Sequence, residues 1–270
     1  MAVAAFPNAL EAIGRTSVRF VDELGYVVAL LVESIYWLLI GRRRNQPVSL
    51  REIFHQSMEV GVSALPIGMT LALGVGLMLG IQGIHTLRTF GAESQVVTGI
   101  AWSVTREFSA LIVGILVAGR SGSALAARIG TMVVNQEIDA LRVIGINPVR
   151  HLVAPTLVAL VVTVPALVIL SMGVSLLGGA IYTGIELQMS PLLYFEETFR
   201  ILAVSDVMQG MSKAVLFAII ITLVGAANGF SATGGAEGVG RATTRSVVVS
   251  ITGIISTDMV FAFFVTRMTG

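Results

Sequence analysis

Five long apolar stretches constrain this chain more than any other feature of its sequence. Each has about 20 residues or more, which is the length that an α-helix needs to cross the hydrocarbon core of a bilayer. They cover residues 60–84, 95–118, 151–181, 207–230 and 247–265. The composition agrees, since 55% of the residues are hydrophobic and only 12% are charged. The sequence therefore predicts an all-α integral membrane protein with five transmembrane helices.

Residues 18–40 form a further apolar stretch, which either lies in the membrane interface or is partly inserted. Asp22, Glu23 and Glu33 interrupt it. Three carboxylates are costly to bury in hydrocarbon, so we predict a helix that lies in the interface. The first ten residues lack the basic region and cleavage site of a signal peptide, and none is predicted.

The chain divides into an N-terminal helical region, residues 1–59, and a transmembrane domain, residues 60–270. Ser49 and Glu52 have the spacing of a capping box, which predicts that a helix begins between the two parts. Two polar connections inside the second part are expected to differ. Residues 191–202 begin with a proline and predict a surface helix, whereas residues 231–240 are rich in glycine and predict a link between two spans.

Residues 134–148 form a polar island between two apolar spans. Its apolar residues recur with helical spacing, and Gly145 followed by Pro148 marks the end of the helix. The apolar positions are Val134, Ile138, Leu141 and either Ile144 or Gly145. We expect a capped amphipathic helix of roughly ten residues, too short to cross a bilayer and placed on its surface, where a partner binds it.

The basic residues predict the orientation, because cytoplasmic loops carry an excess of Lys and Arg. With the N-terminus inside, only Arg88, Arg200 and Arg267 fall outside. The residues on the cytoplasmic side are then Arg15, Arg19, Arg42, Arg43, Arg44, Arg51, Arg120, Arg128, Arg142, Arg150, Arg241 and Arg245. The short helix is therefore expected in the cytoplasm and the C-terminus in the periplasm.

The residue inventory argues against an enzyme. Cysteine is absent and the three histidines are far apart, so neither a disulfide nor a Cys/His metal site is expected. No nucleophile and base pair is apparent, and we name no catalytic residue. The only lysine, Lys213, follows Ser212 and not a glycine, so a phosphate-binding loop is missing and the chain is not expected to bind ATP itself.

Four charged residues fall inside the predicted spans: Arg106, Glu107, Lys213 and Asp258. Ionisable groups at membrane depth are expensive to keep and indicate function. Two interpretations stay open at this point. The four groups pair with one another across the bundle or face a water-filled cavity, or else Glu107 contacts a substrate directly.

Four stretches resemble the MlaE/YrbE family of permeases, the membrane subunits of ABC transporters that work with MCE-domain proteins. They are G-L-M-L-G-I-Q-G at 76–83, R-E-F-S-A-L-I-V-G-I-L-V-A-G-R-S-G-S-A-L-A-A-R-I-G at 106–130, N-Q-E-I-D-A-L-R-V-I-G-I-N-P at 135–148, and N-G-F with G-V-G-R-A-T-T-R-S-V-V within 228–249. The third stretch is the most specific. The resemblance covers the chain from its first span to its last.

The resemblance implies an MlaE-type fold with an N-terminal interfacial helix and five transmembrane helices, assembled as a homodimer in a bacterial inner membrane. It also implies that a cytoplasmic ABC ATPase binds ATP-Mg and contacts a coupling helix, that a periplasmic MCE-domain hexamer sits on the opposite face, and that a small accessory subunit accompanies the ATPase. The coupling residues would be Gln136, Glu137, Ile138, Asp139, Leu141 and Arg142.

The implied substrate is a phospholipid or similar lipid that moves between the inner and outer membranes of a diderm bacterium. Its cavity would be lined by Leu77, Leu79, Arg106, Glu107 and Leu111. No nucleic acid partner is expected. Two other functions are weighed against this one: an ion-coupled secondary transporter that uses Glu107 and Lys213 as a relay, and a scaffold that only anchors soluble partners.

Overall fold

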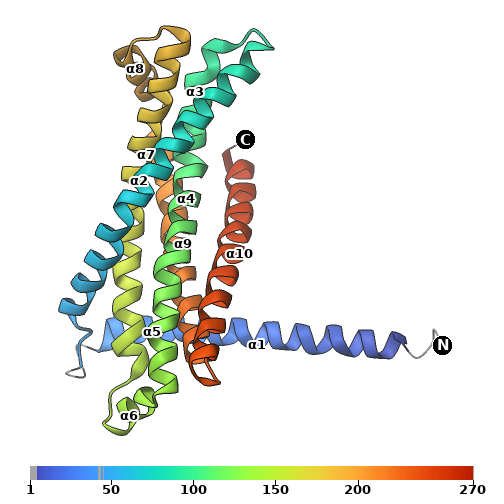
Figure 1. The fold of residues 1–270 in the computed structure, drawn as a ribbon, viewed down its shortest axis with the longest axis vertical. Helices are drawn as coiled ribbons and strands as arrows, with labels where there is room; N and C mark the ends of the chain where they lie inside the picture. The colour runs from blue at the N-terminus through green and yellow to red at the C-terminus, as the bar shows by residue number, and fades with distance from the viewer. Residues whose placement is uncertain (1–4, 42–43, 45, 270) are drawn as a thin grey trace.

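The computed structural model describes residues 5–41, 44 and 46–269, and over these residues it contains helices and no strand (Figure 1). For residues 5–17, 19, 20, 266, 268 and 269 it describes the backbone alone. Arg42 and Arg43, which entered the prediction of orientation, lie outside the described residues. The α-helices are α1 (Ala5–Ile40), α2 (Leu50–Arg88), α3 (Val96–Ser103), α4 (Ser109–Val117), α5 (Ser123–Val134), α6 (Glu137–Val143), α7 (Ala154–Leu187), α8 (Pro191–Ile201), α9 (Val204–Phe230) and α10 (Gly235–Thr269).

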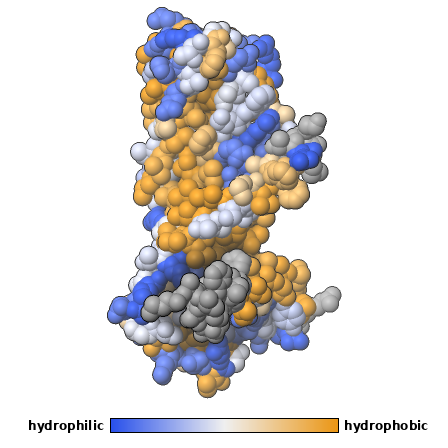
Figure 2. All heavy atoms as spheres, turned by 90° about the vertical axis from the view of Figure 1, so that its right-hand side faces the viewer, coloured by the Kyte–Doolittle hydropathy of each residue, from blue (hydrophilic) through white to orange (hydrophobic). Residues whose placement is uncertain are grey.

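Six helical stretches are long and apolar enough to cross a bilayer. Five of them run alongside one another in Figure 1: α2, the rod formed by α3 to α5, α7, α9 and α10. Figure 2 shows a broad hydrophobic band on one face of this bundle, between two more polar ends. The predicted all-α membrane fold with five bundled spans is confirmed.

The sixth stretch belongs to α1, which lies across one end of the bundle (Figure 1). Leu30 is buried there, but most of the described side chains of α1 are exposed. Its carboxylates meet polar groups of the bundle end: Glu23 pairs with Arg245 at 2.5 Å, and Glu33 accepts a hydrogen bond from Asn147 at 2.7 Å. This arrangement agrees with an interfacial helix, because these charges need no burial in hydrocarbon.

The rod begins at Val96 and continues to Val134 through two π-helical turns, η2 (Val104–Phe108) and η3 (Ala118–Gly122). The helix therefore continues past residue 118, where the predicted span ends. Gly122 does not interrupt the helix, because α9 packs closely over it: a Cβ there would lie 3.0 Å from the side chain of Ile221. With the short η1 turn before it, the stretch has 42 residues and is roughly 60 Å long, so it extends beyond the hydrocarbon core.

Helices α7 and α9 are largely buried, whereas α2 and α10 leave most of their surface exposed. The tightest contact joins α2 to α7. A Cβ at Gly76 would lie 1.9 Å from the carbonyl oxygen of Ser175, and the hydroxyl of Ser175 donates to the carbonyl oxygen of Ala72 at 2.9 Å. The glycine thus allows two backbones to touch, as small residues do between membrane helices.

The predicted helix starts are confirmed where a cap specifies them. The Ser49 side chain accepts from the Glu52 amide at 3.3 Å and opens α2, which continues without a break past residue 60. The Ser190 side chain accepts from the Leu193 amide at 3.3 Å and opens α8, close to the bounds predicted for the surface helix.

The predicted glycine-rich link at 231–240 is shorter than expected, because α10 begins at Gly235. The turn is confined to the first half, where Gly234 and Gly235 have φ values of +88° and +72°. Beyond it, Glu237 and Arg241 pair at 2.5 Å across one turn of helix, which supports the first turns of α10 despite their glycines.

Candidate functional site

Three of the four predicted intramembrane charges meet in the middle of the bundle. Glu107 comes from η2 in the rod, Lys213 from α9 and Asp258 from α10. The ammonium of Lys213 is hydrogen-bonded to a carboxylate oxygen of Glu107 and lies 2.9 Å from Oδ1 of Asp258. Three elements that are far apart in the sequence are therefore tied together by one lysine.

The environment of the three groups is unequal. The side chain of Lys213 is fully buried, that of Asp258 is 15% exposed, and that of Glu107 is 34% exposed. Lys213 also lies 5.5 Å from the centre of the Phe261 ring, where a cation is attracted by the aromatic face. Because two carboxylates share one ammonium, the cluster carries a formal charge of −1, with Glu107 as its most accessible member.

Arg106 does not join this cluster. Its guanidinium pairs with Asp206 at 2.8 Å and lies over the Trp102 ring at 4.7 Å. Asp206 also accepts from the amide of Ala203 at 2.9 Å and so caps the start of α9. Asp206 was missed as a charge partner, although its place near the start of a predicted span was a signal of helix capping.

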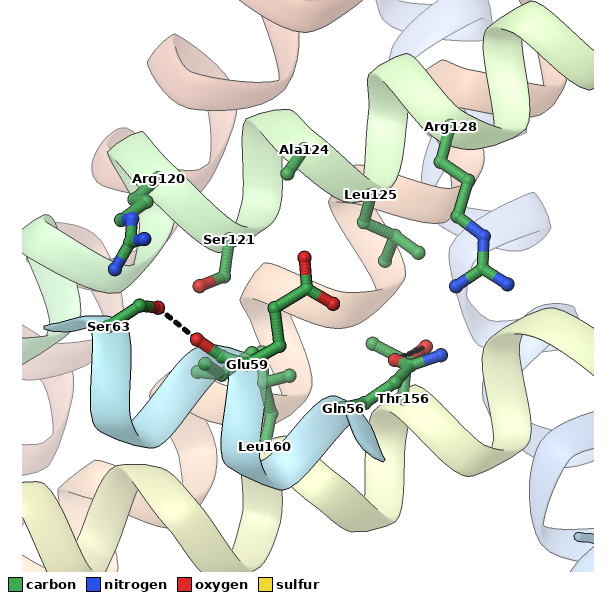
Figure 3. Close-up of a pocket in the computed structure, with 11 residues that line it drawn as sticks. Gln56, Glu59, Ser63, Arg120, Ser121, Ala124, Leu125, Arg128, Thr156 and Leu160 are labelled. Atoms are coloured by element: carbon green, nitrogen blue, oxygen red, sulfur yellow. Dashed lines mark hydrogen bonds between the residues drawn. The ribbon is translucent and has the colours of Figure 1, made fainter. Parts of the chain in front are cut away.

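The apolar residues expected around a substrate lie on α2 and on α4, which follows the η2 turn that carries Glu107. Leu79 and Leu111 are half-buried and pack against the main core, and Leu77 is half-buried on α2. A pocket lies between α2, α5 and α7 (Figure 3), and none of these three leucines lines it. The role of these three leucines stays a prediction.

The predicted coupling helix is α6, which projects at the end of the bundle beside α1 (Figure 1). It has seven residues, fewer than predicted, because α5 continues to Val134 and Gln136 turns the chain with φ of +60°. The predicted cap at Gly145 is confirmed by its φ of +81°.

Within α6, Ile138 is the buried anchor, and Leu141 is half-buried against the same small core. Gln136, Glu137, Asp139 and Arg142 are exposed, and Asp139 pairs with Arg142 at 3.2 Å. Ile144, predicted on the packed side, is 68% exposed. The prediction for Ile144 is therefore wrong: its side chain points outward, because the helix ends at Val143.

Among the residues that the structure describes, no group of three or more His, Asp or Glu side chains is placed to hold a metal ion. The site thus consists of a buried ion cluster within the spans and an exposed helix at one end. The fold and these two features define the class of a multi-pass membrane protein.

Comparison with known proteins makes the assignment specific. Residues 53–264 match the family described as Permease MlaE. A probable ABC transporter permease protein of Rickettsia typhi is 31% identical over 94% of this chain and 98% of its own length. The intermembrane phospholipid transport system permease protein MlaE of Haemophilus influenzae is 30% identical over 94% and 95%. The chloroplastic protein trigalactosyldiacylglycerol 1 of Arabidopsis thaliana is 32% identical over 79% and 61%. The chain belongs to the MlaE permease family.

Proposed function

We propose that this chain is the permease subunit of an ABC transporter that moves phospholipid between the inner and outer membranes of a diderm bacterium. The observation that carries the proposal is the similarity along 94% of the chain to a Haemophilus protein whose name states intermembrane phospholipid transport. The membrane-embedded charges support it, since they give an apolar bundle a polar feature at the depth that a lipid must cross.

The energy for transport would come from a separate cytoplasmic ATPase, which binds ATP-Mg and docks on α6. Three observations favour α6 as the docking element. Its charged side chains are exposed, Ile138 fixes it to the bundle, and Val143 and Ile144 extend 86% and 68% exposed apolar side chains outward. An exposed apolar group with a charged rim is the usual composition of a protein interface.

In this proposal the end of the bundle that carries α1 and α6 faces the cytoplasm, as the distribution of arginines favours. The opposite end, with α8 and the turn between α2 and α3, faces the periplasm and the MCE-domain hexamer. A small accessory subunit would accompany the ATPase.

A second copy of the chain would complete the lipid cavity. Arg106 and Glu107 are 38% and 34% exposed at the middle of the spans, where contact with lipid tails is costly. A second copy that covers this face would enclose them together with Leu77, Leu79 and Leu111. Because the chain has no cysteine, a Phe108→Cys variant should form a disulfide only between copies, whereas Ile169→Cys on the exposed side of α7 should not.

The proposal is tested by mild extraction of the protein from membranes, followed by mass spectrometry of the proteins and lipids that co-purify. The wild type is compared with a Glu137→Lys, Asp139→Lys double variant of α6. The matched control is Glu196→Lys, Glu197→Lys, which reverses two charges on α8 at the other end of the bundle.

We expect the wild type and the α8 variant to bring both an ATPase and phospholipid. The α6 variant should keep the lipid and lose the ATPase. If no ATPase accompanies the wild type, the assignment of an ABC transporter fails, and transport driven by an ion gradient becomes the function to test. If the α6 variant retains the ATPase as well as the wild type does, the coupling role of α6 is refuted.

A further inference from the structure

A pocket of about 240 Å³ lies between α2, α5 and α7, away from the charge cluster of the spans (Figure 3). Leu125 and Leu160 contribute an apolar floor, and the wall carries the charged residues Glu59, Arg120 and Arg128. Pockets that enclose a whole drug-sized ligand have about 300–1,000 Å³. The volume therefore suits a small polar group and not a complete lipid.

The depth of the pocket follows from positions along the rod. Glu93, at the start of the 42-residue stretch, pairs with Arg88 at 2.9 Å and marks one polar boundary. Arg120 lies 27 residues further on, which is about 40 Å at 1.5 Å per residue. A bilayer with its headgroup regions is about 40–45 Å thick. The pocket thus lies at the level of the lipid headgroups, on the side of α6.

Two charges of the pocket neighbourhood satisfy each other. Arg128 pairs with Glu52 at 3.3 Å, and the side-chain amide of Gln56 donates to the same carboxylate at 2.9 Å. Gln56 in turn accepts a hydrogen bond from the hydroxyl of Thr156. The polar groups in this part of the wall are therefore paired with one another, and no ligand is required to satisfy them.

Two other charges have no such partner. Among the described residues, the guanidinium of Arg120 makes no ion pair or hydrogen bond, and the carboxylate of Glu59 has only a 4.0 Å contact with His55. Figure 3 shows the Glu59 carboxylate directed across the pocket toward α5, with Arg120 and Arg128 on either side. The pocket therefore offers one free cation and one free anion. Arg120 is presented from the π-helical turn η3, and such turns are frequent at functional sites.

We propose that this pocket binds the headgroup of a zwitterionic phospholipid, with Arg120 on the phosphate and Glu59 on the ammonium. Arginine suits a phosphate, because its planar guanidinium can donate two parallel hydrogen bonds. A purely anionic headgroup would satisfy Arg120 and leave Glu59 facing a like charge.

The pocket also selects between two zwitterionic classes. A quaternary ammonium is usually held by the faces of aromatic rings, and none of the 11 lining residues is aromatic. A primary ammonium donates hydrogen bonds to a carboxylate such as Glu59. The structure therefore favours a phosphoethanolamine headgroup over a phosphocholine headgroup. This inference rests on the proposed lipid-transport function, because that function brings lipid to the protein.

The test is native mass spectrometry of the full-length protein in detergent, titrated with phosphatidylethanolamine, phosphatidylcholine and phosphatidylglycerol that carry the same acyl chains. We expect the wild type to prefer phosphatidylethanolamine. Glu59→Gln should lower that affinity about tenfold and abolish the preference over phosphatidylglycerol, while Arg120→Gln should weaken all three lipids. Glu237→Gln, an exposed charge near the start of α10, is the matched control and should bind as the wild type does.

Soluble phosphoethanolamine should compete for the site more strongly than inorganic phosphate, which distinguishes a headgroup site from a simple phosphate site. Melting midpoints of the variants verify that each is folded, and neither Glu59 nor Arg120 leaves a buried partner when it is replaced. Equal affinity of the wild type for the three lipids, or a Glu59→Gln variant indistinguishable from the control, would overturn the inference. If phospholipid still co-purifies in that case, the proposed function stands. If no phospholipid co-purifies, the proposed function fails first.

Discussion

Replacing Lys213 by methionine tests how the bundle is held together at its centre. Lys213 is fully buried, and its ammonium is the cation shared by Glu107 and Asp258. Methionine has a similar length and no charge, so the substitution removes the charge with little change of volume. Two carboxylates from the rod and α10 would then face each other without the cation that joins them.

The size of the effect follows from the geometry. At an effective dielectric constant of about 20, two unit charges 2.9 Å apart attract each other by about 6 kcal/mol, and much of this is offset by desolvation. Removal of one partner from a buried pair costs about 3–5 kcal/mol. Because Glu107 is one-third exposed, we expect the lower end, about 3 kcal/mol. For a chain of this length that corresponds to a melting midpoint lower by roughly 6–12 °C.

The assay is thermal denaturation in detergent, followed by the fraction that stays monodisperse on size-exclusion chromatography. Ser212→Ala, an exposed neighbour on α9, is the control and should melt with the wild type. The triple variant Glu107→Gln, Lys213→Met, Asp258→Asn should recover most of the loss, since no charge is left unpaired. The reasoning is refuted if Lys213→Met melts within 2 °C of the wild type, on the order of 1 kcal/mol or less, or if the triple variant is no more stable than the single one.

Three further predictions concern packing, capping and pH. Gly76→Ala should lower the melting midpoint strongly, because its Cβ would meet a backbone carbonyl of α7. Gly74→Ala, with no atom within 4 Å, should leave the midpoint unchanged or raise it by the equivalent of up to about 1 kcal/mol. Asp206→Ala removes the cap of α9 and should speed amide hydrogen exchange in its first turn by the equivalent of about 1–2 kcal/mol, whereas the exposed Ser205→Ala should not. Burial raises the pKa of Tyr194 on α8, so its neutral form stabilises the fold below about pH 10 and this contribution is lost as the pH rises further. A Tyr194→Phe variant should lose less stability than the wild type in melting curves measured from about pH 9 to 12.

The helices could be predicted where their signals are local. Hydropathy and length place the five spans, and the caps at Ser49, Ser190 and Gly145 are formed by residues within a few positions of one another. The end of α5 could not be predicted in this way. Gly119 and Gly122 flank Arg120 and weaken a helix in isolation, whereas the close approach of α9 to Gly122 is a contact between distant parts of the chain.

The pairing of the charges depends on the fold. Arg106 and Glu107 are adjacent in the sequence, yet Arg106 pairs with Asp206 and Glu107 pairs with Lys213. Successive residues of a helix point in different directions, and the π-helical turn at this place shifts the register further. The sequence could therefore identify which charges are unusual, but not which of them meet. The sequence likewise predicts Arg120 as a cytoplasmic charge, but it does not show that Arg120 lines a pocket with Glu59.

The two polar sites differ in depth on a single rigid element. Glu107 and Arg120 are 13 residues apart on the rod, which places them about 20 Å apart along its axis. One leaflet of hydrocarbon is about 15 Å thick, half of the bilayer core. A headgroup bound at Arg120 therefore cannot reach Glu107 without leaving its pocket.

Since α3 to α5 form one continuous helical rod, the rod itself cannot shorten the distance between the two sites. Helix α6 follows α5 after only two residues. A partner that pushes on α6 would thus act on the rod that carries both sites, which is the coupling that the proposed function requires.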